Sequence, residues 1–155
     1  MIQLKRIVVP TDLSEFSQHA VRYGCEFARR FEAELHLLTV VQDVVAMVPE
    51  PGMAFPAPGE YMQELRDASQ QALSKIPEGD MAAGLQITRE VRSGTPFVEI
   101  VRYARDVDAD LVVIGTHGRS GLAHVLLGST AEKVVRKAPC PVLTVRPEGH
   151  DFVMP

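Results

Sequence analysis

The sequence predicts an α/β fold, with an open, mostly parallel five-stranded sheet and helices on both of its faces. Short apolar segments of strand length alternate with longer segments in which apolar residues recur every three or four positions. Residues 111–114 are apolar without alternation, which is typical of a strand buried on both faces of a parallel sheet. Right-handed crossovers between such strands place helices on both faces.

The first half of the chain predicts two strands and two helices. Residues 4–9 form a short apolar strand, and from Ser14 the apolar spacing predicts a helix that includes Phe31. Residues 35–41 form the second strand. After a loop rich in Pro and Met, the second helix is marked by a series at helical spacing: Tyr61, Leu65, Ala68, Ala72 and Ile76, with Pro77-Glu-Gly79 as its end.

The second half predicts three further strands and two helices. Residues 85–91 alternate apolar and polar side chains, which indicates a half-exposed edge strand. A third helix begins near Pro96, since proline suits a first helical turn. After the central strand at residues 111–114, residues 129–137 form the fourth helix and residues 141–146 the fifth strand.

Composition indicates one globular domain over residues 1–147, followed by a polar tail at 148–155. The chain has 155 residues, 46% hydrophobic and 23% charged. A net charge of -4, without a continuous basic run, disfavours nucleic acid and anionic membrane as partners. No apolar run approaches the roughly 20 residues of a membrane helix, and the charged N-terminal segment is unlike a signal peptide, so we expect a cytoplasmic protein.

The cysteines and histidines predict neither a disulfide framework nor a metal site built from protein ligands. Cys25 and Cys140 belong to no CxxC or Cys/His spacing and are interpreted as packed thiols. The five histidines are scattered at positions 19, 36, 117, 124 and 150.

The segment 115–130 carries the pattern that is most informative about function. It reads Gly115-Thr-His-Gly118, then nine residues, then Gly128-Ser129-Thr130, and it leads from the central strand into a helix. Glycines let backbone N–H groups approach an anion, and a helix N-terminus adds donors and partial positive charge. We therefore expect a phosphate-binding loop. It is neither a P-loop, which needs a following Gly-Lys-Ser/Thr, nor a dinucleotide fingerprint.

This glycine pattern resembles that of the nucleotide-binding branch of the universal stress protein family. The resemblance extends from Ile7-Val-Val-Pro10-Thr11-Asp12 through Gly94-Thr-Pro96 and Asp110-Leu-Val-Val-Ile-Gly115 to Cys140-Pro-Val-Leu-Thr-Val145. It implies the strand order 3-2-1-4-5, which the pattern of elements leaves open. In that order the chain reverses between the first and fourth strands, and ligands bind at the carboxyl ends of such strands.

The resemblance also implies a ligand and the residues that bind it. In the family, the residues matching Pro10, Thr11 and Asp12 line an adenosine pocket, with the acidic side chain near the ribose or base, and the backbone at Val40 meets the adenine. The expected ligand is ATP or another adenine nucleotide, with Mg²⁺ held mainly by the phosphates. The predicted binding residues are Pro10, Thr11, Asp12, Val40, Gly115, Thr116, His117, Gly118, Arg119, Gly128, Ser129 and Thr130.

Several of these residues also have purely structural interpretations. Asp12 can cap the helix that follows it, and Val40 can be a core valine. Ser129 and Glu132 match a Ser-x-x-Glu capping box. Backbone N–H groups at Gly128, Ser129 and Thr130 can hold phosphate even if that box forms.

The loop side chains likewise have two interpretations. Arg119 either reaches the phosphates or is a solvated loop residue. His117 is interpreted as structural or adjacent to the phosphates, because no acid or nucleophile stands near it in the sequence.

A regulatory ATP-binding protein of the stress response, with little or slow hydrolysis, is the function that these features favour. Fast phosphoryl transfer needs a positioned base, a phosphate clamp and protein carboxylates on the metal, and the sequence shows only fragments of that set. The alternative is a slow ATPase or nucleotidyl-transfer enzyme, although Pro10-Thr-Asp-Leu-Ser14 lacks the Ser-Gly-Gly-x-Asp-Ser and His-x-Gly-His loops of such enzymes. A third alternative is an interaction module that acts on an unknown protein partner without nucleotide, which predicts a broken glycine loop.

A homodimer through the fifth strand is also expected. The implied strand order leaves residues 142–145 at an edge with unpaired backbone groups, and apolar side chains there can form an isologous contact. A proline at Leu143 is expected to remove an edge donor. Pro141 and Pro147 can instead serve to blunt the edge.

Overall fold

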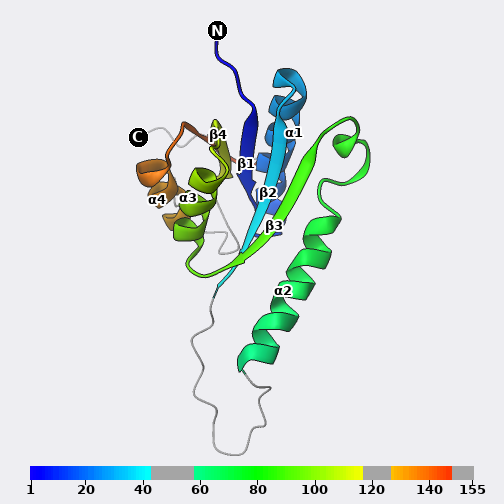
Figure 1. The fold of residues 1–155 in the computed structure, drawn as a ribbon, viewed down its shortest axis with the longest axis vertical. Coiled ribbons are helices and arrows are strands. Elements are labelled where there is room, and N and C mark those ends of the chain that lie inside the picture. The colour runs from blue at the N-terminus through cyan, green and yellow to red at the C-terminus, as the bar shows by residue number, and fades with distance from the viewer. Residues whose placement is uncertain (43–57, 117–126, 148–155) are drawn as a thin grey trace, which may run out of the picture.

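A five-stranded sheet in the order β3-β2-β1-β4-β5 lies at the centre of the structure (Figure 1). The computed structural model describes residues 1–42, 58–116 and 127–147. The strands are β1 (Arg6–Pro10), β2 (Glu34–Val41), β3 (Ile87–Ser93), β4 (Leu111–Gly115) and β5 (Val142–Val145). Each pair of neighbouring strands is parallel. The predicted fold class and strand order are confirmed.

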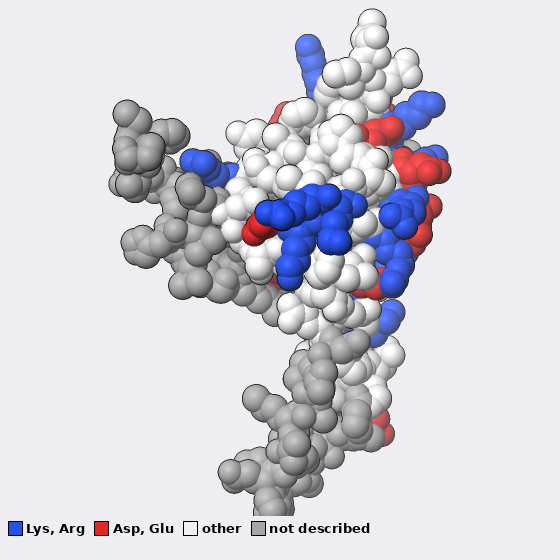
Figure 2. Space-filling view, turned by 90° about the vertical axis from the view of Figure 1, so that its left-hand side faces the viewer, with Lys and Arg blue, Asp and Glu red and all other residues white. Residues whose placement is uncertain are grey.

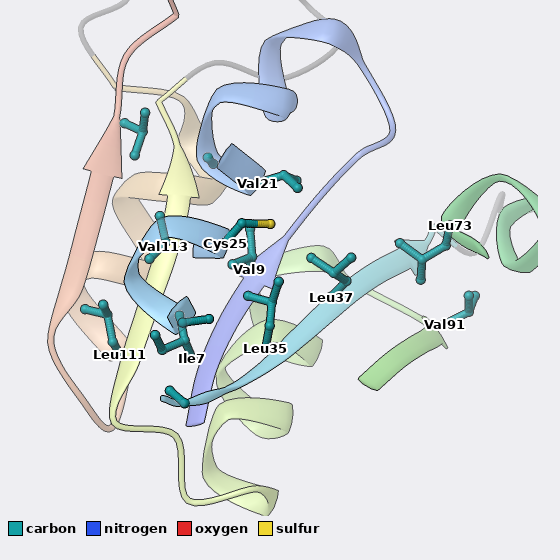
Figure 3. Packing of buried hydrophobic residues seen from close by; sticks show 14 of the residues in the cluster. Ile7, Val9, Val21, Cys25, Leu35, Leu37, Leu73, Val91, Leu111 and Val113 are labelled. Atoms are coloured by element: carbon teal, nitrogen blue, oxygen red, sulfur yellow. The ribbon is translucent and has the colours of Figure 1, made fainter. Parts of the chain in front are cut away.

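Helices cover both faces of this sheet and define two separate apolar clusters. They are α1 (Glu15–Phe31), α2 (Pro58–Ser74), α3 (Pro96–Asp106) and α4 (Ser129–Lys137), with a short 3₁₀ helix η1 (Gly79–Ala82). One cluster joins α1 and α2 to alternate strand residues such as Ile7 and Val113 (Figure 3). The other joins α3 and α4 to the intervening residues, such as Val8 and Val112. The absence of alternation in β4 is explained, because both of its faces are covered.

A glycine allows α1 to lie close to the strands beneath it. A Cβ at Gly24 would overlap the side chain of Val9 and would lie 3.3 Å from Cδ1 of Leu35. Any larger residue would push α1 away from β1 and β2. The position of α1 on the sheet therefore depends on the missing side chain.

The ends of several elements differ from the sequence-based prediction; β3, for example, begins at Ile87 instead of residue 85. β1 begins at Arg6 instead of residue 4. Its start is fixed by the carboxylate of Asp110, whose Oδ2 accepts the N–H groups of Lys5 (2.7 Å) and Arg6 (2.9 Å). α2 ends at Ser74 and does not reach residue 76. A residue that precedes a proline disfavours the helical conformation, so Pro77 ends the helix two residues earlier than we predicted.

A buried polar pair connects β2 to α3. His36 is only 5% exposed, and its Nδ1 lies 2.9 Å from the hydroxyl oxygen of Tyr103. Its Nε2 lies 3.4 Å from Oε1 of Glu34, an oxygen that accepts a hydrogen bond from the hydroxyl of Thr88. Burial lowers the pKa of His36 below 6.5, partly opposed by Glu34, and burial also raises the pKa of Tyr103 to about 12.

We expect this histidine to make the stability depend on pH. Because the pKa of His36 is lowered in the folded state, the unfolded chain binds the proton preferentially once the pH falls below 6.5. The contribution of neutral His36 to the free energy of unfolding is full above pH 6.5 and is lost as the pH falls towards the lowered pKa. The difference in unfolding free energy between the native chain and His36→Gln should therefore shrink between about pH 8 and about pH 5, as measured by urea unfolding. Parallel pH profiles for the two proteins would contradict this assignment.

Candidate functional site

The carboxyl ends of β1, β2 and β4 bring several predicted site residues to one edge of the sheet. In the register of β1 on β4, Val8 lies opposite Val112, which places Thr11 and Gly115 at the same level. The Thr11 N–H donates to the carbonyl of Leu38 (2.9 Å), and the hydroxyl of Thr39 donates to the carbonyl of Thr11 (3.0 Å). The segment after β1 is thus held against β2, the neighbouring strand (Figure 1).

The side chain of Thr11 builds the turn from β1 into α1. Thr11 is 5% exposed, and its Oγ1 accepts the N–H of Leu13 (3.0 Å) and lies 2.8 Å from Oγ of Ser17. The hydroxyl of Ser17 donates to the carbonyl of Ser14 (2.8 Å), so the Thr11 hydroxyl is the donor in the shared bond. The polar atoms of Thr11 are therefore engaged within the protein.

Asp12 makes the structural contacts of a turn residue, in agreement with one of its two interpretations. Its Oδ1 accepts both the N–H (3.0 Å) and the hydroxyl (2.5 Å) of Ser14, the residue that precedes α1. A carboxylate has about four acceptor positions, so it can accept more than two hydrogen bonds. The carboxylate is held in one orientation before any ligand arrives.

The backbone is strained at the residue that follows Asp12. Leu13 has φ of 65°, in the left-handed region that a branched side chain rarely adopts. Such a conformation costs about 1–3 kcal/mol and is found where surrounding contacts enforce it, often at functional sites. The side chains of Thr11 and Asp12 supply that enforcement, because they accept the N–H groups of Leu13 and of the next residue, Ser14.

A hydrogen-bonded clip fixes the start of α4 against the sheet. The Gly128 N–H donates to the carbonyl of Thr116 (2.7 Å), and the Thr116 N–H donates to the carbonyl of Val145 (2.9 Å). A Cβ at Gly128 would lie 3.0 Å from the Thr116 oxygen, so glycine permits the close approach. In this structure the Gly128 N–H has a partner within the protein, and its contact with phosphate stays a prediction.

The predicted capping box is wrong, because the N-cap of the helix is one residue before Ser129. α4 begins at Ser129 with Gly128 as its N-cap, and no side chain caps it. Glu132 pairs instead with Arg136, one turn further on (2.8 Å). The first intrahelical bond runs from the Glu132 N–H to the Gly128 carbonyl, so the N–H groups of residues 129–131 are left without intrahelical acceptors. These donors, and the exposed Ser129 hydroxyl, face no competition from a cap.

The remaining predicted residues fall into two groups. Val40 is half-buried against the cluster under α3 and α4, which agrees with its interpretation as a core residue. Three residues lie outside the described part of the chain: His117, Gly118 and Arg119.

Both cysteines are packed, as expected: burial raises the pKa of the buried Cys25 thiol and of the half-buried Cys140 thiol. Within the described ranges, no three His, Cys, Asp or Glu side chains are grouped as a metal site would require. No helix in those ranges is long and apolar enough to cross a membrane.

Three residues that brace this end of the sheet had no prediction from the sequence. Thr39 is a polar residue within the otherwise apolar end of β2, and it holds the backbone of Thr11. Ser14 and Ser17 orient Asp12 and Thr11. The available signal was the presence of hydroxyl side chains at positions where a strand or helix begins or ends.

A parallel sheet whose order reverses between β1 and β4, with helices starting at that edge on both faces, defines an α/β protein of the class that binds ligands at the reversal point. The chain belongs to the universal stress protein family, whose sequence model matches residues 3–146.

Known proteins support this assignment. Universal stress protein MJ0531 of Methanocaldococcus jannaschii is 39% identical, over 92% of this chain and 82% of the relative. The solved structure of protein MJ0577 of the same organism has a TM-score of 0.80 at 28% identity, and covers 96% of this chain and 99% of its own. A universal stress protein solved in complex with cAMP has a TM-score of 0.69 at 27% identity, over 95% and 100% of the two chains.

The clip at the start of α4 predicts a stability cost for a side chain at Gly128. Gly128→Val should lower the unfolding free energy by about 1–3 kcal/mol, because the branched side chain pushes on the Thr116 carbonyl. Ser129→Ala, at the adjacent exposed position, should change it by less than about 0.5 kcal/mol. Urea unfolding of both variants measures the difference, and equal stabilities would show that the close approach carries no energetic weight.

Proposed function

We propose that this chain is a regulatory, ATP-binding member of the family that acts in the stress response and hydrolyses ATP slowly or not at all. The observation that carries this proposal is the convergence of two features at the reversal point. The carboxylate of Asp12 follows β1, and the first turn of α4 follows β4. The carboxylate is suited to ribose hydroxyls, and the N–H groups of the helix turn are suited to phosphate.

In this proposal the nucleotide lies across the edge of the sheet between the two helix N-termini. The N–H groups of residues 129–131 receive phosphate oxygens, the carboxylate of Asp12 receives ribose hydroxyls, and the backbone at Val40 meets the adenine. The loop residues His117, Gly118 and Arg119 complete the phosphate contacts. The cAMP complex of a relative supports an adenine nucleotide as the class of ligand. Mg²⁺ is held mainly by the phosphates, since the ion keeps several waters and needs few protein ligands.

The contacts at this edge favour binding over fast catalysis. Phosphoryl transfer at ordinary enzyme rates needs a group poised to orient a nucleophile. The hydroxyl of Thr11 is engaged with Ser17, and Asp12 is fixed by two bonds to Ser14. A slow ATPase or a nucleotidyl transferase is the competing function, and the rate of turnover separates it from the proposal.

We expect ATP with Mg²⁺ to bind with measurable heat in isothermal titration. Asp12→Asn should weaken binding about 10- to 150-fold, as expected when a hydrogen bond to a charged group is lost, at about 1.5–3 kcal/mol. Ser14→Ala is the matched control, because it removes one bond to Oδ1 and keeps the carboxylate. Phosphate release should stay below about 1 s⁻¹.

Two outcomes separate failure of binding from failure of the regulatory assignment. Absence of heat with ATP and Mg²⁺ would overturn nucleotide binding, and turnover at or above about 1 s⁻¹ would make the protein an enzyme. Gly118→Val provides a test of the loop, because a side chain there should abolish binding while the fold persists. Unchanged affinity in a folded Gly118→Val protein would show that the loop does not hold phosphate.

We further propose that the protein forms a homodimer through the free edge of β5. The side chains that we expected at the interface pack within the subunit instead: Val145 is buried, and Val142 and Leu143 contact opposite clusters. The proposal therefore rests on the backbone. Carbonyls of Pro141 and Val145 accept bonds from β4 residues or the Thr116 that follows, so the alternation of a strand turns the backbone of Val142 and Thr144 outward.

This alternation changes the test of the dimer. Leu143→Pro removes a donor that faces β4, not the edge, and would damage the subunit itself. Thr144→Pro removes an outward donor at an exposed position, so it should convert a dimer to a monomer in sedimentation velocity. Thr144→Val keeps that donor and should remain dimeric. A native chain that sediments as a monomer at micromolar concentration, or a dimeric Thr144→Pro variant, would refute the edge pairing.

A further inference from the structure

The outer surfaces of α3 and α4 form a basic face on an otherwise acidic molecule. The two helices pack together on one side of the sheet, and Figure 2 shows Lys and Arg side chains gathered at the centre of the view from that side. The chain as a whole has a net charge of -4, so this cluster contrasts with the rest of the surface. The basic face consists of exposed residues of both helices: Arg102, Arg105, Lys133, Arg136 and Lys137.

Internal ion pairs neutralise only part of this charge. Arg102 pairs with Glu99, a carboxylate that also lies 3.8 Å from Arg92, and Arg136 pairs with Glu132. Arg105 and Lys137 have no ion-pair partner among the residues that the structure describes. Two cations on neighbouring helices therefore remain available to an anionic partner.

These two cations stand on the rim of an apolar groove. The groove has a volume of about 230 Å³, and its apolar lining comes from Phe97, Val98 and Val101 of α3. Arg102, Arg105 and Lys137 complete the lining. All three apolar residues are half-buried and form the floor of the groove. An apolar floor with a cationic rim is complementary to an apolar side chain flanked by carboxylates.

We propose that this groove binds an acidic peptide segment of a partner protein. One apolar side chain of the segment lies on the floor, and neighbouring carboxylates pair with Arg105 and Lys137. Stacking of nucleic acid bases needs an exposed aromatic face, whereas the ring of Phe97 is covered by the Lys133 ammonium at 5.0 Å. A membrane surface needs exposed apolar side chains, whereas Phe97, Val98 and Val101 are half-buried. The proposal does not depend on nucleotide binding, because none of the groove residues belongs to the proposed nucleotide site.

The test uses the full chain and a fluorescein-labelled peptide of Glu and Asp with one central Leu, followed by fluorescence anisotropy at low salt. We expect saturable binding that Arg105→Glu combined with Lys137→Glu weakens at least about tenfold, or 1.4 kcal/mol. A peptide with Ser in place of Leu should also bind about tenfold more weakly, because the floor loses its apolar contact. Both substituted positions are exposed, and the unfolding temperature should fall only slightly, because Glu in a last helical turn is unfavourable with the helix dipole.

Arg30→Glu combined with Lys75→Glu provides the matched control. These exposed residues lie on α1 and just after α2, away from the groove, and the change in net charge is the same. Equal weakening by the control would mean that the peptide senses only overall charge, and equal binding of the Ser peptide would mean that the floor is not used. Either result, or the absence of saturable binding, would overturn the proposal. So would tighter binding of duplex DNA or phosphatidylserine vesicles that the groove variant abolishes.

Discussion

The pairing of β1 with β2 on one side and β4 on the other is the constraint on which the rest of the structure depends. The strand order reverses between β1 and β4, so the segments that follow these two strands leave the sheet side by side. The carboxylate of Asp110 secures the β4 side by receiving two backbone N–H groups at the start of β1. Hydrogen bonds to a charged group contribute about 1.5–3 kcal/mol each, more than a typical neutral bond.

At the opposite end of β1 the same pairing sustains local strain. The left-handed conformation of Leu13 costs about 1–3 kcal/mol, which is comparable to the sum of a few net hydrogen bonds of about 1 kcal/mol each. The bonds from Thr11 and Asp12 supply that number of contacts. The turn is thus ordered before any ligand binds, which reduces the conformational entropy that the protein loses on binding.

The sequence predicts the elements well because their signals are local. Periodicity locates the helices and strands, and the unalternating run of β4 identifies a strand covered on both faces. Pro77 also acts locally. It ends α2 at Ser74, before Ile76, which the apolar spacing alone includes in the helix.

The contacts that the sequence did not predict join residues that are distant in the chain or depend on the phase of a strand. The Gly128 N-cap follows from a bond to Thr116, twelve positions earlier, and it moves the helix start by one residue relative to the Ser-x-x-Glu pattern. Which backbone groups of β5 face outward depends on its register with β4, which periodicity does not contain. The basic face had no signature in the net charge, because its residues come together only when α3 and α4 pack as neighbours.

α4 is the element that connects the two proposed surfaces. Its N-terminal turn lies at the reversal point of the sheet, and Lys137 at its other end stands on the rim of the groove. At 1.5 Å per residue, a helix of nine residues separates these points by roughly 12 Å. The clip at Gly128 and the buried residues Ala131 and Val134 fix the helix to the sheet. Linkage requires that any effect of bound nucleotide on the affinity of the groove is matched by an equal effect of an acidic segment on the affinity for nucleotide.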